Sequence, residues 1–523
     1  MFVQLAENLF KKSDFATCRR LILAVSGGGD SLALLFLVRD YLKTLPSPPE
    51  MIVVTIDHQL RKESAHEAKS VSEICRIYQI KHIIVRWEGE KPKTNISEKS
   101  RIARYNLLFD EAQKQGATLI MTGHTLNDQV ETYQMRSQRI SKTVNILQQK
   151  KDETYQTHSQ HIRENISLFQ QEKGSNACTE IETKSVTNGT PKNSDELVYE
   201  RGLSCIPREA LLRQQVRLIR PLLGIEREIL RDYLRFRGET WIDDPTNENL
   251  NFERARVRRS MHSEKLTILA KKVNHAALKR RLQTQKIADL ILALDIAVEY
   301  GRCFIGKPAP FLSQHPDFPF IVGLFAVLMG GSPYLLSHKK LRALNQRLCL
   351  EHFEKKRFTL AGSVIEYNQN GITFWREARN IKETVVEPGK TFVWDGRYQI
   401  SNHGEESIKV GTANLSQLKG YLDNGITLDN GTMEPKRPHF PSLQSLLMIS
   451  NDKMTDIPEL TYPSPFMTSN NKIIDHSQSI NPFHPQYKIT IRRIMAPFNW
   501  LLSREDAAIV SVVGPFFNIE WKR

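Results

Sequence analysis

Residues 21–37 read LILAVSGGGDSLALLFL and decide the fold of the first half of this chain. The apolar run Leu21–Val25 predicts a buried strand, and the Leu/Ala-rich run after Ser31 predicts a helix. Three consecutive glycines at 27–29 lie between them, and glycine tolerates positive φ and lets a ligand come close to the backbone. A strand, a glycine turn and a helix N-terminus together present free amides and positive potential to a phosphate group. This stretch therefore predicts a phosphate-binding turn.

The polar side chains of the turn fit the same prediction. Ser26 and Ser31 can donate hydroxyl hydrogen bonds, and Asp30 can hold the Mg²⁺ that a phosphate group brings with it. The turn has no lysine at the position that a Walker A loop requires, which excludes the ordinary P-loop. A structural glycine turn with a serine cap is the alternative, but three glycines in a row are costly unless something approaches closely.

The turn resembles the SGGxDS signature of the PP-loop ATP pyrophosphatase superfamily. The resemblance implies an enzyme that adenylates an oxygen of its substrate, releases pyrophosphate and lets a nucleophile displace AMP. It also implies ATP as a cofactor. The residues that match the signature are Ser26, Gly27, Gly28, Gly29, Asp30 and Ser31.

Composition narrows the class of protein. A chain of 523 residues with 40% hydrophobic and 25% charged residues is typical of a globular protein of two to four domains. The net charge of +15 favours a polyanionic partner such as nucleic acid. The six cysteines form no CxxC pair, which argues against a zinc ribbon or an iron–sulfur site and fits a reducing cytosol. We find no signal peptide and no apolar run of about eighteen residues, so we expect a cytoplasmic protein without a membrane span.

Strands and helices alternate after the glycine turn. Apolar runs at 51–56, 82–87 and 117–121 predict strands, and helical patterns at 64–78 and 97–115 separate them. This order predicts a parallel sheet with helices on both faces, whose ligands sit beyond the carboxyl ends of the strands. We therefore expect the turn to meet two other strand ends, Asp57-His58 and Gly123-His124-Thr125.

The pattern of the chain predicts three domains. Residues 1–260 form an α/β, parallel-sheet PP-loop (adenine nucleotide α hydrolase-like) catalytic domain, interrupted at about 137–200 by a polar insertion that is too poor in apolar residues to order itself. Residues 261–383 form a helical middle domain, helical over 261–299 and ending in a short β-meander at 358–375. Residues 384–523 form a small α+β accessory domain.

Four further segments resemble one family of the superfamily, tRNA(Ile)-lysidine synthetase. Residues 57–64, DHQLRKES, resemble its DHxLRxxS segment, and residues 101–105, RIARY, resemble its ARxxRY helix. Residues 123–132, GHTLNDQVET, are similar to its GHxxDDQxET segment. Between 220 and 258 the chain has RPLL, DPTN and a series of arginines in the same order. Asn127 departs from the pattern, because many relatives have a second acidic residue there.

The resemblance implies a reaction and a set of site residues. The family joins free L-lysine to the wobble cytidine of an isoleucine tRNA with a CAU anticodon, through an adenylated tRNA intermediate. The implied catalytic residues are Asp30, Asp128 and Glu131, with Asp30 also the candidate Mg²⁺ ligand. Beside the turn residues, the implied nucleotide-binding residues are Asp57 and His124. The implied tRNA-binding residues are Arg101, Arg104, Arg254, Arg256 and Arg258. The resemblance also implies that the middle domain at 261–383 binds tRNA and that the accessory domain at 384–523 takes part in tRNA recognition.

Physical chemistry leaves alternatives open at these positions. Asp128 and Glu131 stand three residues apart, on one face of a helix, where two carboxylates can hold an ammonium group. Acidic residues at a helix N-terminus are also stabilised by the helix dipole alone. The arginines at 254–258 suit phosphate contacts but also suit a solvated edge. At the level of the whole protein, the rival interpretations are a PP-loop tRNA thiolation enzyme and a non-catalytic tRNA-binding protein. The oligomeric state stays open.

Overall fold

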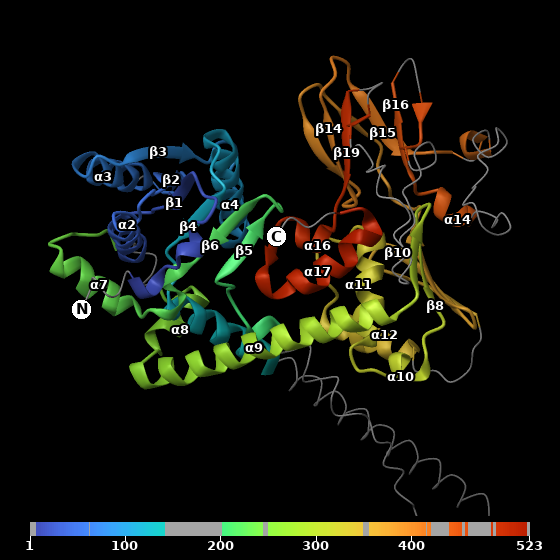
Figure 1. The fold of residues 1–523 in the computed structure, drawn as a ribbon, viewed down its shortest axis with the longest axis horizontal. Helices are drawn as coiled ribbons and strands as arrows, with labels where there is room; N and C mark the ends of the chain where they lie inside the picture. Colours follow the sequence, from blue (N-terminus) through green and yellow to red (C-terminus); the bar gives the residue numbers. More distant parts are fainter. Residues whose placement is uncertain are drawn as a thin grey trace, which may run out of the picture. The chain divides into compact units, whose positions relative to one another are not determined.

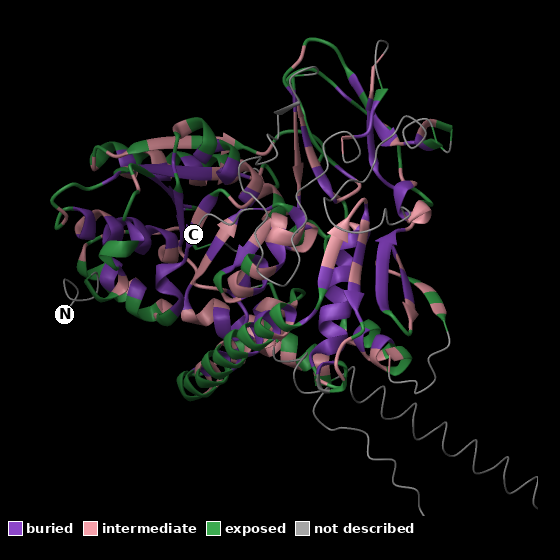
Figure 2. Cartoon of the chain, turned by 45° about the vertical axis from the view of Figure 1, so that its right-hand side comes forward, coloured by how far each residue is buried: buried purple, intermediate pink, exposed green. Residues whose placement is uncertain are grey.

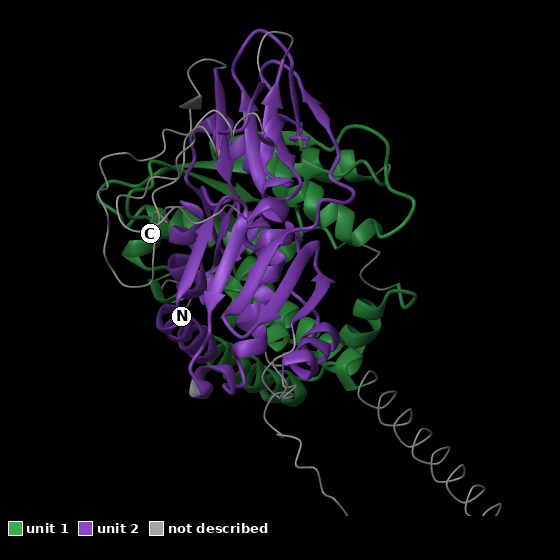
Figure 3. Ribbon diagram, turned by 90° about the vertical axis from the view of Figure 1, so that its right-hand side faces the viewer, with its two compact units in different colours: residues 1–108, 121–208, 220–280 green, residues 109–120, 209–219, 281–523 purple. Residues whose placement is uncertain are grey.

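The computed structural model describes residues 7–61, 63–141, 201–243, 249–348, 355–414, 416–419, 439–451, 455–458, 483–484 and 488–519. The chain divides into two compact units (Figure 3). Unit 1 comprises residues 1–108, 121–208 and 220–280, and unit 2 comprises residues 109–120, 209–219 and 281–523. The predicted insertion lies outside the described residues from 142 onward, and so does the DPTN segment at 244–247. The predicted three-domain division stays a prediction.

Unit 1 is built on parallel strands, as the alternating pattern predicted. Strands β1 (Arg20–Ala24), β2 (Glu50–Asp57) and β3 (Lys81–Arg86) pair in parallel, and β4 (Leu119–Thr122) lies next to β1 (Figure 1). Much of the described chain, including the strands, is buried (Figure 2). In this sheet, residues 21–23 of β1 and 52–53 of β2 are apolar and fully buried. The predicted α/β fold class is confirmed.

The helices that begin in unit 1 carry most of the site. Their bounds are α2 (Gly29–Leu42), α3 (Ser64–Ile77), α4 (Ile96–Gln115), an unlabelled helix over 126–141, α7 (Arg227–Phe236), α8 (Glu253–Arg259) and α9 (Ser263–Ala293). The last residues of α4 and α9 belong to unit 2. Helix α2 is buried from Ser31 to Val38, because its Leu/Ala-rich sequence packs on both sides. No helix among the described residues is long and apolar enough to cross a membrane.

Unit 2 contains the predicted β-meander in a larger antiparallel sheet. Its strand order is β7-β8-β11-β10-β9, with bounds β7 (Ile296–Glu299), β8 (Arg302–Gly306), β9 (Lys356–Leu360), β10 (Ser363–Asn368) and β11 (Gly371–Arg376). The helix predicted over 261–299 was too long: α9 ends at Ala293, and β7 turns through Tyr300 and Gly301 into β8. Three further antiparallel strands are β5 (Glu209–Leu212), β6 (Val216–Ile219) and β20 (Leu501–Ser503).

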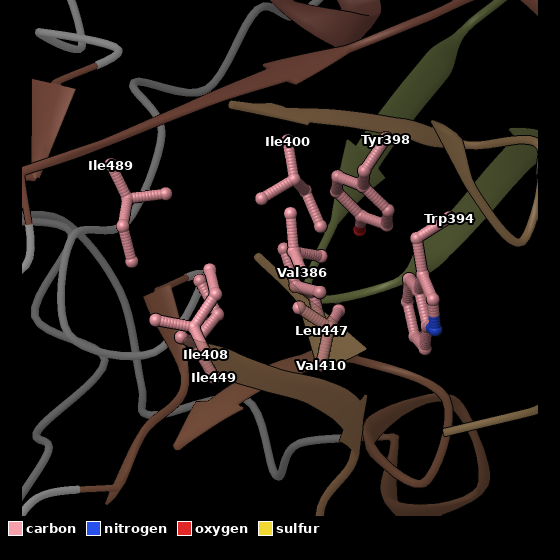
Figure 4. Close-up of a cluster of buried hydrophobic side chains, with 9 residues drawn as sticks. All are labelled: Val386, Trp394, Tyr398, Ile400, Ile408, Val410, Leu447, Ile449 and Ile489. Atoms are coloured by element: carbon pink, nitrogen blue, oxygen red, sulfur yellow. The ribbon is translucent and has the colours of Figure 1, made fainter. Parts of the chain in front are cut away.

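Two four-stranded antiparallel sheets form the C-terminal part of unit 2. The first has the order β12 (Thr384–Val386), β15 (Ile408–Thr412), β16 (Leu447–Ser450) and β17 (Thr455–Asp456). The second has the order β13 (Thr391–Trp394), β14 (Tyr398–Asn402), β19 (Ile489–Arg493) and β18 (Phe483–His484). Alternate residues of both sheets, among them Trp394 and Ile449, share one buried cluster (Figure 4). The core of this part is therefore a sandwich.

Helices complete unit 2. They are α10 (Pro310–Ser313), α11 (Phe318–Gly330), α12 (His338–Leu348), α14 (Phe440–Leu443), α16 (Ala496–Asn499) and α17 (Ala507–Val513). Helix α11 is buried over its whole length. It ends at Gly331, which has a φ of +72°, the left-handed conformation that favours glycine at this position.

A close backbone contact follows the end of α11. A Cβ atom at Gly331 would overlap the carbonyl oxygen of Asp395, and a Cβ at Gly396 would overlap that of Gly331. The Asp395 carboxylate lies 2.8 Å from the Arg376 guanidinium and 2.7 Å from that of Arg397, and all three side chains are buried. We call this contact the glycine junction; it joins α11 to the loop between β13 and β14.

Candidate active site

The glycine turn connects β1 to α2 as predicted, and its side chains brace it. The Ser31 hydroxyl accepts a hydrogen bond from the Ser26 amide at 3.1 Å and donates one to the Gly28 carbonyl at 2.9 Å. Gly27 has a φ of +86°, which a side chain would strain. Within the described part of the chain, the amides of residues 27–30 donate no hydrogen bond. These four amides at a helix N-terminus are free to bind a phosphate group.

Two neighbouring segments close on the turn. A Cβ at Gly123 would lie 2.9 Å from the Asp30 carbonyl oxygen, so the end of β4 reaches the start of α2 only because residue 123 is glycine. The Ile242 amide donates to the Gly27 carbonyl at 3.1 Å, and the Trp241 ring packs against Gly29. The predicted approach of the strand end at 123–125 to the turn is therefore present in the structure.

Three carboxylates meet on one arginine that the sequence analysis did not identify. Arg227 donates to Asp30 at 2.9 Å and to Asp128 at 3.4 Å, and its guanidinium lies 3.6 Å from Glu131. Its backbone amide donates to the Asn127 side chain at 2.9 Å, which fixes the start of α7 beside the helix at 126–141. The site that the glycine turn begins thus extends to both predicted helix carboxylates.

Two of the predicted tRNA-binding arginines lie on the same carboxylates. Arg254 donates to Glu131 and to Asp128, each at 2.7 Å, and Arg258 donates to Glu131 at 2.8 Å. Because one guanidinium spans Asp128 and Glu131, the two carboxylates lie on one helix face, as their spacing predicted. Arg256 instead donates to the backbone carbonyls of Leu250 and Asn251. The structure therefore separates Arg256 from the other two.

Burial decides the electrostatics of this carboxylate–arginine network. Burial raises the pKa of Asp30, and the Arg227 guanidinium opposes that rise only in part. The three surrounding carboxylates raise the pKa of Arg227 although its own burial lowers it. The Glu131 side chain is only 1% exposed and contacts Arg227, Arg254 and Arg258, so this buried carboxylate has three cationic partners.

Asp57 has a local structural role. Its carboxylate accepts hydrogen bonds from the Ser64 hydroxyl at 2.7 Å and from the Gln59 amide at 2.9 Å, which turns the chain from β2 into α3. The next residue, His58, packs edge-on against Trp87, and burial lowers its pKa to about 4. A contact of Asp57 with the nucleotide stays a prediction.

A second group of charges lies on the first half of α4. The guanidinium carbons of Arg101 and Arg104 lie 5.3 and 5.5 Å from the centre of the Tyr105 ring, and Arg220 donates to the Tyr105 hydroxyl at 3.1 Å. His124 is nearby: its burial and these three arginines, with Arg254, hold its pKa well below the usual range. We call Arg101, Arg104, Tyr105, Arg220 and His124 the basic cluster.

Tyr105 gives this cluster a measurable titration. Its burial alone would raise the pKa of the phenol, but Arg220, Arg101 and Arg104 lower it to about 8 from the ordinary 10.0. We expect one phenolate to appear near pH 8 in an absorbance titration at 295 nm, and the step to vanish in Tyr105→Phe. The pKa of Tyr105 is about 8 in the folded protein and 10.0 in the unfolded chain. The phenolate of Tyr105 therefore adds its full contribution to the free energy of unfolding above pH 10, and this contribution disappears as the pH falls through about 8. A titration without a step near pH 8 contradicts the prediction.

The amides of the turn suit the phosphates of ATP, and Asp30 is the residue that suits Mg²⁺. The free amides and positive φ of the turn fit a triphosphate without rearrangement. No group of three or more acidic, histidine or cysteine side chains that could cage a metal occurs among the described residues. Mg²⁺ commonly binds through one or two carboxylates together with substrate phosphates, and Asp30 beside the turn meets that requirement.

The parallel sheet, the glycine turn and its free amides define a PP-loop, ATP-utilising enzyme. Residues 2–168 and 198–265 match the model of the PP-loop domain family. The chain is 62% identical to a tRNA(Ile)-lysidine synthase of Bartonella henselae over 523 residues, all of both chains. It is 32% identical to one of Brucella suis over 422 residues, 80% of this chain and 82% of that one. The chain belongs to the tRNA(Ile)-lysidine synthase family, which confirms the resemblance seen in its motifs.

One solved structure shows a much weaker similarity to this chain. The U34-tRNA thiolase NcsA from Methanococcus maripaludis, solved with its [4Fe-4S] cluster, has a TM-score of 0.34 and 12% identity. The match covers 52% of this chain and 76% of that one. At that distance the likeness says nothing about substrate or reaction.

Proposed function

We propose that this enzyme ligates free L-lysine to carbon 2 of the wobble cytidine in an isoleucine tRNA with a CAU anticodon, in the cytoplasm. In the first step the cytosine 2-oxygen attacks the α-phosphorus of ATP, and pyrophosphate leaves. In the second step the ε-amine of lysine attacks carbon 2, the bond to the oxygen breaks, AMP leaves and the amine loses its proton. One observation carries the proposal. The glycine turn, whose amides donate no hydrogen bond within the described residues, lies beside three carboxylates that all contact Arg227.

The glycine turn supports the adenylation step. Its four free amides are placed to hold the phosphates of ATP, and Ser26 and Ser31 brace the turn. Asp30 follows the turn directly and would hold Mg²⁺ on the oxygen that Arg227 leaves free, since Arg227 donates to Oδ2. Mg²⁺ there would offset the charge of the departing pyrophosphate. His124, neutral at pH 7, would contribute one hydrogen bond to the nucleotide.

The carboxylate pair supports the binding of lysine. Arg254 spans Asp128 and Glu131 at 2.7 Å each, so the pair is spaced to hold one cation between its members. The ammonium of lysine carries the same charge and would take one of these contacts. Asp128 is also held by the Thr125 amide at 2.8 Å, which fixes its orientation at the start of the helix. One carboxylate would accept the proton that the attacking amine loses.

Arginines supply contacts for tRNA in this proposal. Arg101 and Arg104 on α4, and Arg254, Arg256 and Arg258 on α8, would bind phosphates of the anticodon strand. Arg256 is exposed and ordered by its backbone contacts, so it needs no rearrangement to meet RNA. Arg254 and Arg258 would exchange a carboxylate for a phosphate.

Incorporation of radiolabelled lysine into unmodified isoleucine tRNA tests the proposal. We expect label that depends on ATP and resides on the wobble cytidine. Methionine tRNA with the same anticodon is the matched control and stays unlabelled. Release of pyrophosphate without incorporation of lysine would point to another nucleophile, and absence of both from folded protein would contradict the proposal.

Three buried cysteines argue against sulfur transfer. Burial raises the pKa of the thiols of Cys75 and Cys205 to about 11, and it also raises the pKa of the Cys303 thiol. A catalytic thiol requires a depressed pKa because the thiolate is the nucleophile. These three thiols therefore do not support thiolation.

Removing residues 142–200, with a short Gly/Ser linker joining 141 to 201, tests whether this segment takes part in turnover. The segments on either side contact each other, because Arg136 donates to the Gly202 carbonyl at 2.5 Å and the Gln129 side chain binds the backbone of Ile206. Shortening a connection between fixed ends changes its closure entropy only slowly, so we expect lysine incorporation within about tenfold of the full chain. Loss of turnover with an unchanged melting temperature would show that the segment acts in catalysis.

A further inference from the structure

Among the described residues, Arg227 is the one guanidinium that joins Asp30 to the carboxylate pair, Asp128 and Glu131. Its Nε donates to Asp30 Oδ2 at 2.9 Å, and its two terminal nitrogens lie 3.4 Å from Asp128 Oδ1 and 3.6 Å from Glu131 Oε1. Arg254 and Arg258 contact the pair but form no ion pair with Asp30 within the described chain. Arg227 therefore spans the two places where, in the proposed function, ATP and lysine bind.

The contacts of Arg227 with the pair are its long ones. Arg254 approaches the same two carboxylates at 2.7 Å each, and Arg258 approaches Glu131 at 2.8 Å. Charge-assisted N–H···O bonds are normally about 2.7–2.9 Å long, so of the three contacts of Arg227 only the one with Asp30 has the usual length. A shift of this guanidinium toward the glycine turn would break its two weak contacts first.

Arg227 faces one oxygen on each carboxylate of the pair. Asp128 Oδ1 also accepts a shorter bond from Arg254, and Glu131 Oε1 also accepts a shorter bond from Arg258. A carboxylate oxygen has two acceptor positions. Departure of Arg227 would thus leave one acceptor position open on each of the two carboxylates, which suits an ammonium group and its three donors.

Charge balance opposes a further cation in the network as it stands. Three carboxylates contact three guanidinium groups, so their formal charges cancel when all are ionised. The side chains of Glu131 and Arg227 are 1% and 17% exposed, so water screens little of an added charge. A lysine ammonium would be a buried, uncompensated cation unless an anion arrives beside it. The phosphates of ATP at the glycine turn would be that anion, on the Asp30 side of Arg227.

We propose that Arg227 is a positioning residue that links the two sites: with phosphates on the glycine turn, its guanidinium moves toward them and releases the carboxylate pair to the lysine ammonium. Only the side chain moves, because the Arg227 amide is fixed by its donation to the Asn127 side chain at 2.9 Å. The inference rests on the proposed function and adds an order of binding, ATP before lysine, that does not require tRNA.

Calorimetry on the full chain without tRNA measures this link. L-Lysine is titrated with and without saturating Mg²⁺ and the α,β-methylene analogue of ATP, which cannot transfer its AMP group. We expect the analogue to tighten lysine binding to the wild type at least about fivefold, and lysine to tighten binding of the analogue by the same factor, since coupling is reciprocal.

Arg227→Gln should have two effects. Lysine should bind at least about fivefold more tightly than to the wild type when no nucleotide is present, because the competing guanidinium is gone, and the analogue should then change lysine affinity by less than about twofold. Arg227→Lys keeps the charge without the planar fork, and we expect it to restore part of the coupling. A residue that only supports the fold would not raise lysine affinity when removed.

Arg235→Gln is the matched control on the same helix. Arg235 is exposed and pairs with Glu228 and Asp232, both on α7. We expect this variant to bind lysine as the wild type does, with the same response to the analogue.

Four results would overturn the link. Two need only the wild type, so they hold even if a variant does not fold: lysine affinity that the analogue leaves unchanged, and lysine binding that stays undetectable with the analogue present. The other two concern Arg227→Gln: coupling that survives the substitution, and weaker binding of lysine without nucleotide.

A failed link and a failed reaction give different results. If the enzyme incorporates lysine into tRNA but its lysine affinity ignores the analogue, the link is wrong and the reaction stands. If lysine and the analogue bind with coupling that Arg227→Gln removes, but no lysine enters isoleucine tRNA, the link stands and the reaction is wrong.

Discussion

Asp30→Asn is expected to lower the rate of lysine incorporation by roughly 100- to 1000-fold, the range seen when one charge-stabilising group is removed from a reacting phosphate or carbonyl. The amide keeps the shape of the side chain but cannot hold Mg²⁺, and it loses its ion pair with Arg227 at 2.9 Å. The loss falls on adenylation, so release of pyrophosphate in the absence of lysine should fall by the same factor. Affinity for tRNA, measured by filter binding, should change less than about twofold.

Asp40→Asn is the matched control for that change. Asp40 lies on the same helix, α2, and pairs with Arg237 at 2.6 Å, but it is away from the turn and the carboxylates. Its loss should leave both pyrophosphate release and lysine incorporation nearly unchanged. Normal adenylation by Asp30→Asn would place the metal and the reacting phosphate elsewhere.

Glu131→Gln is expected to lower the free energy of unfolding by about 2–3 kcal/mol and to weaken lysine binding at the same time. Removal of one member of a buried ion pair typically lowers the free energy of unfolding by more than this. The arginine partners of Glu131 are 17–43% exposed, however, so water can solvate part of the charge that they would leave unpaired. Three guanidinium groups would remain around a neutral amide. Urea unfolding measures the first effect, and the KM for lysine measures the second.

The control for Glu131 is Glu50→Gln, which removes an exposed pair with Arg20. Surface pairs contribute little, so its unfolding free energy should change by less than about 1 kcal/mol. A Glu131→Gln protein as stable as the wild type would mean that the three arginines are solvated independently. A normal KM for lysine would remove Glu131 from the lysine site and leave Asp128 as the candidate.

Local sequence patterns predicted the parts of the site that depend on neighbours in the chain. The strand, turn and helix at 20–42 follow from burial periodicity and glycine, and the shared face of Asp128 and Glu131 follows from helix geometry. The β-meander at 356–376 was likewise visible in alternating apolar residues. These features depend on contacts within a few residues.

Several side-chain contacts between residues far apart in the chain were not predicted. Arg227 stands among the many arginines of α7, and only the fold brings it to Asp30, 197 residues earlier in the chain. Arg254 and Arg258 were predicted to bind tRNA, with a solvated edge as the alternative. Their contacts with Glu131 were not predicted, because this partner lies more than 120 residues away in the chain. The short strands β5 and β7 carry no periodicity of their own and are set by their antiparallel partners.

The glycine junction limits how this protein can be divided. A chain cut after residue 383 would lose Asp395, the shared partner of Arg376 and Arg397, and would leave Arg376 charged and buried without its counterion. It would also expose the backbone of Gly331 where Gly396 now lies. Residues 384–519 are therefore not a detachable module, and an exchange of these residues with those of a relative would have to preserve their contacts with Gly331 and Arg376.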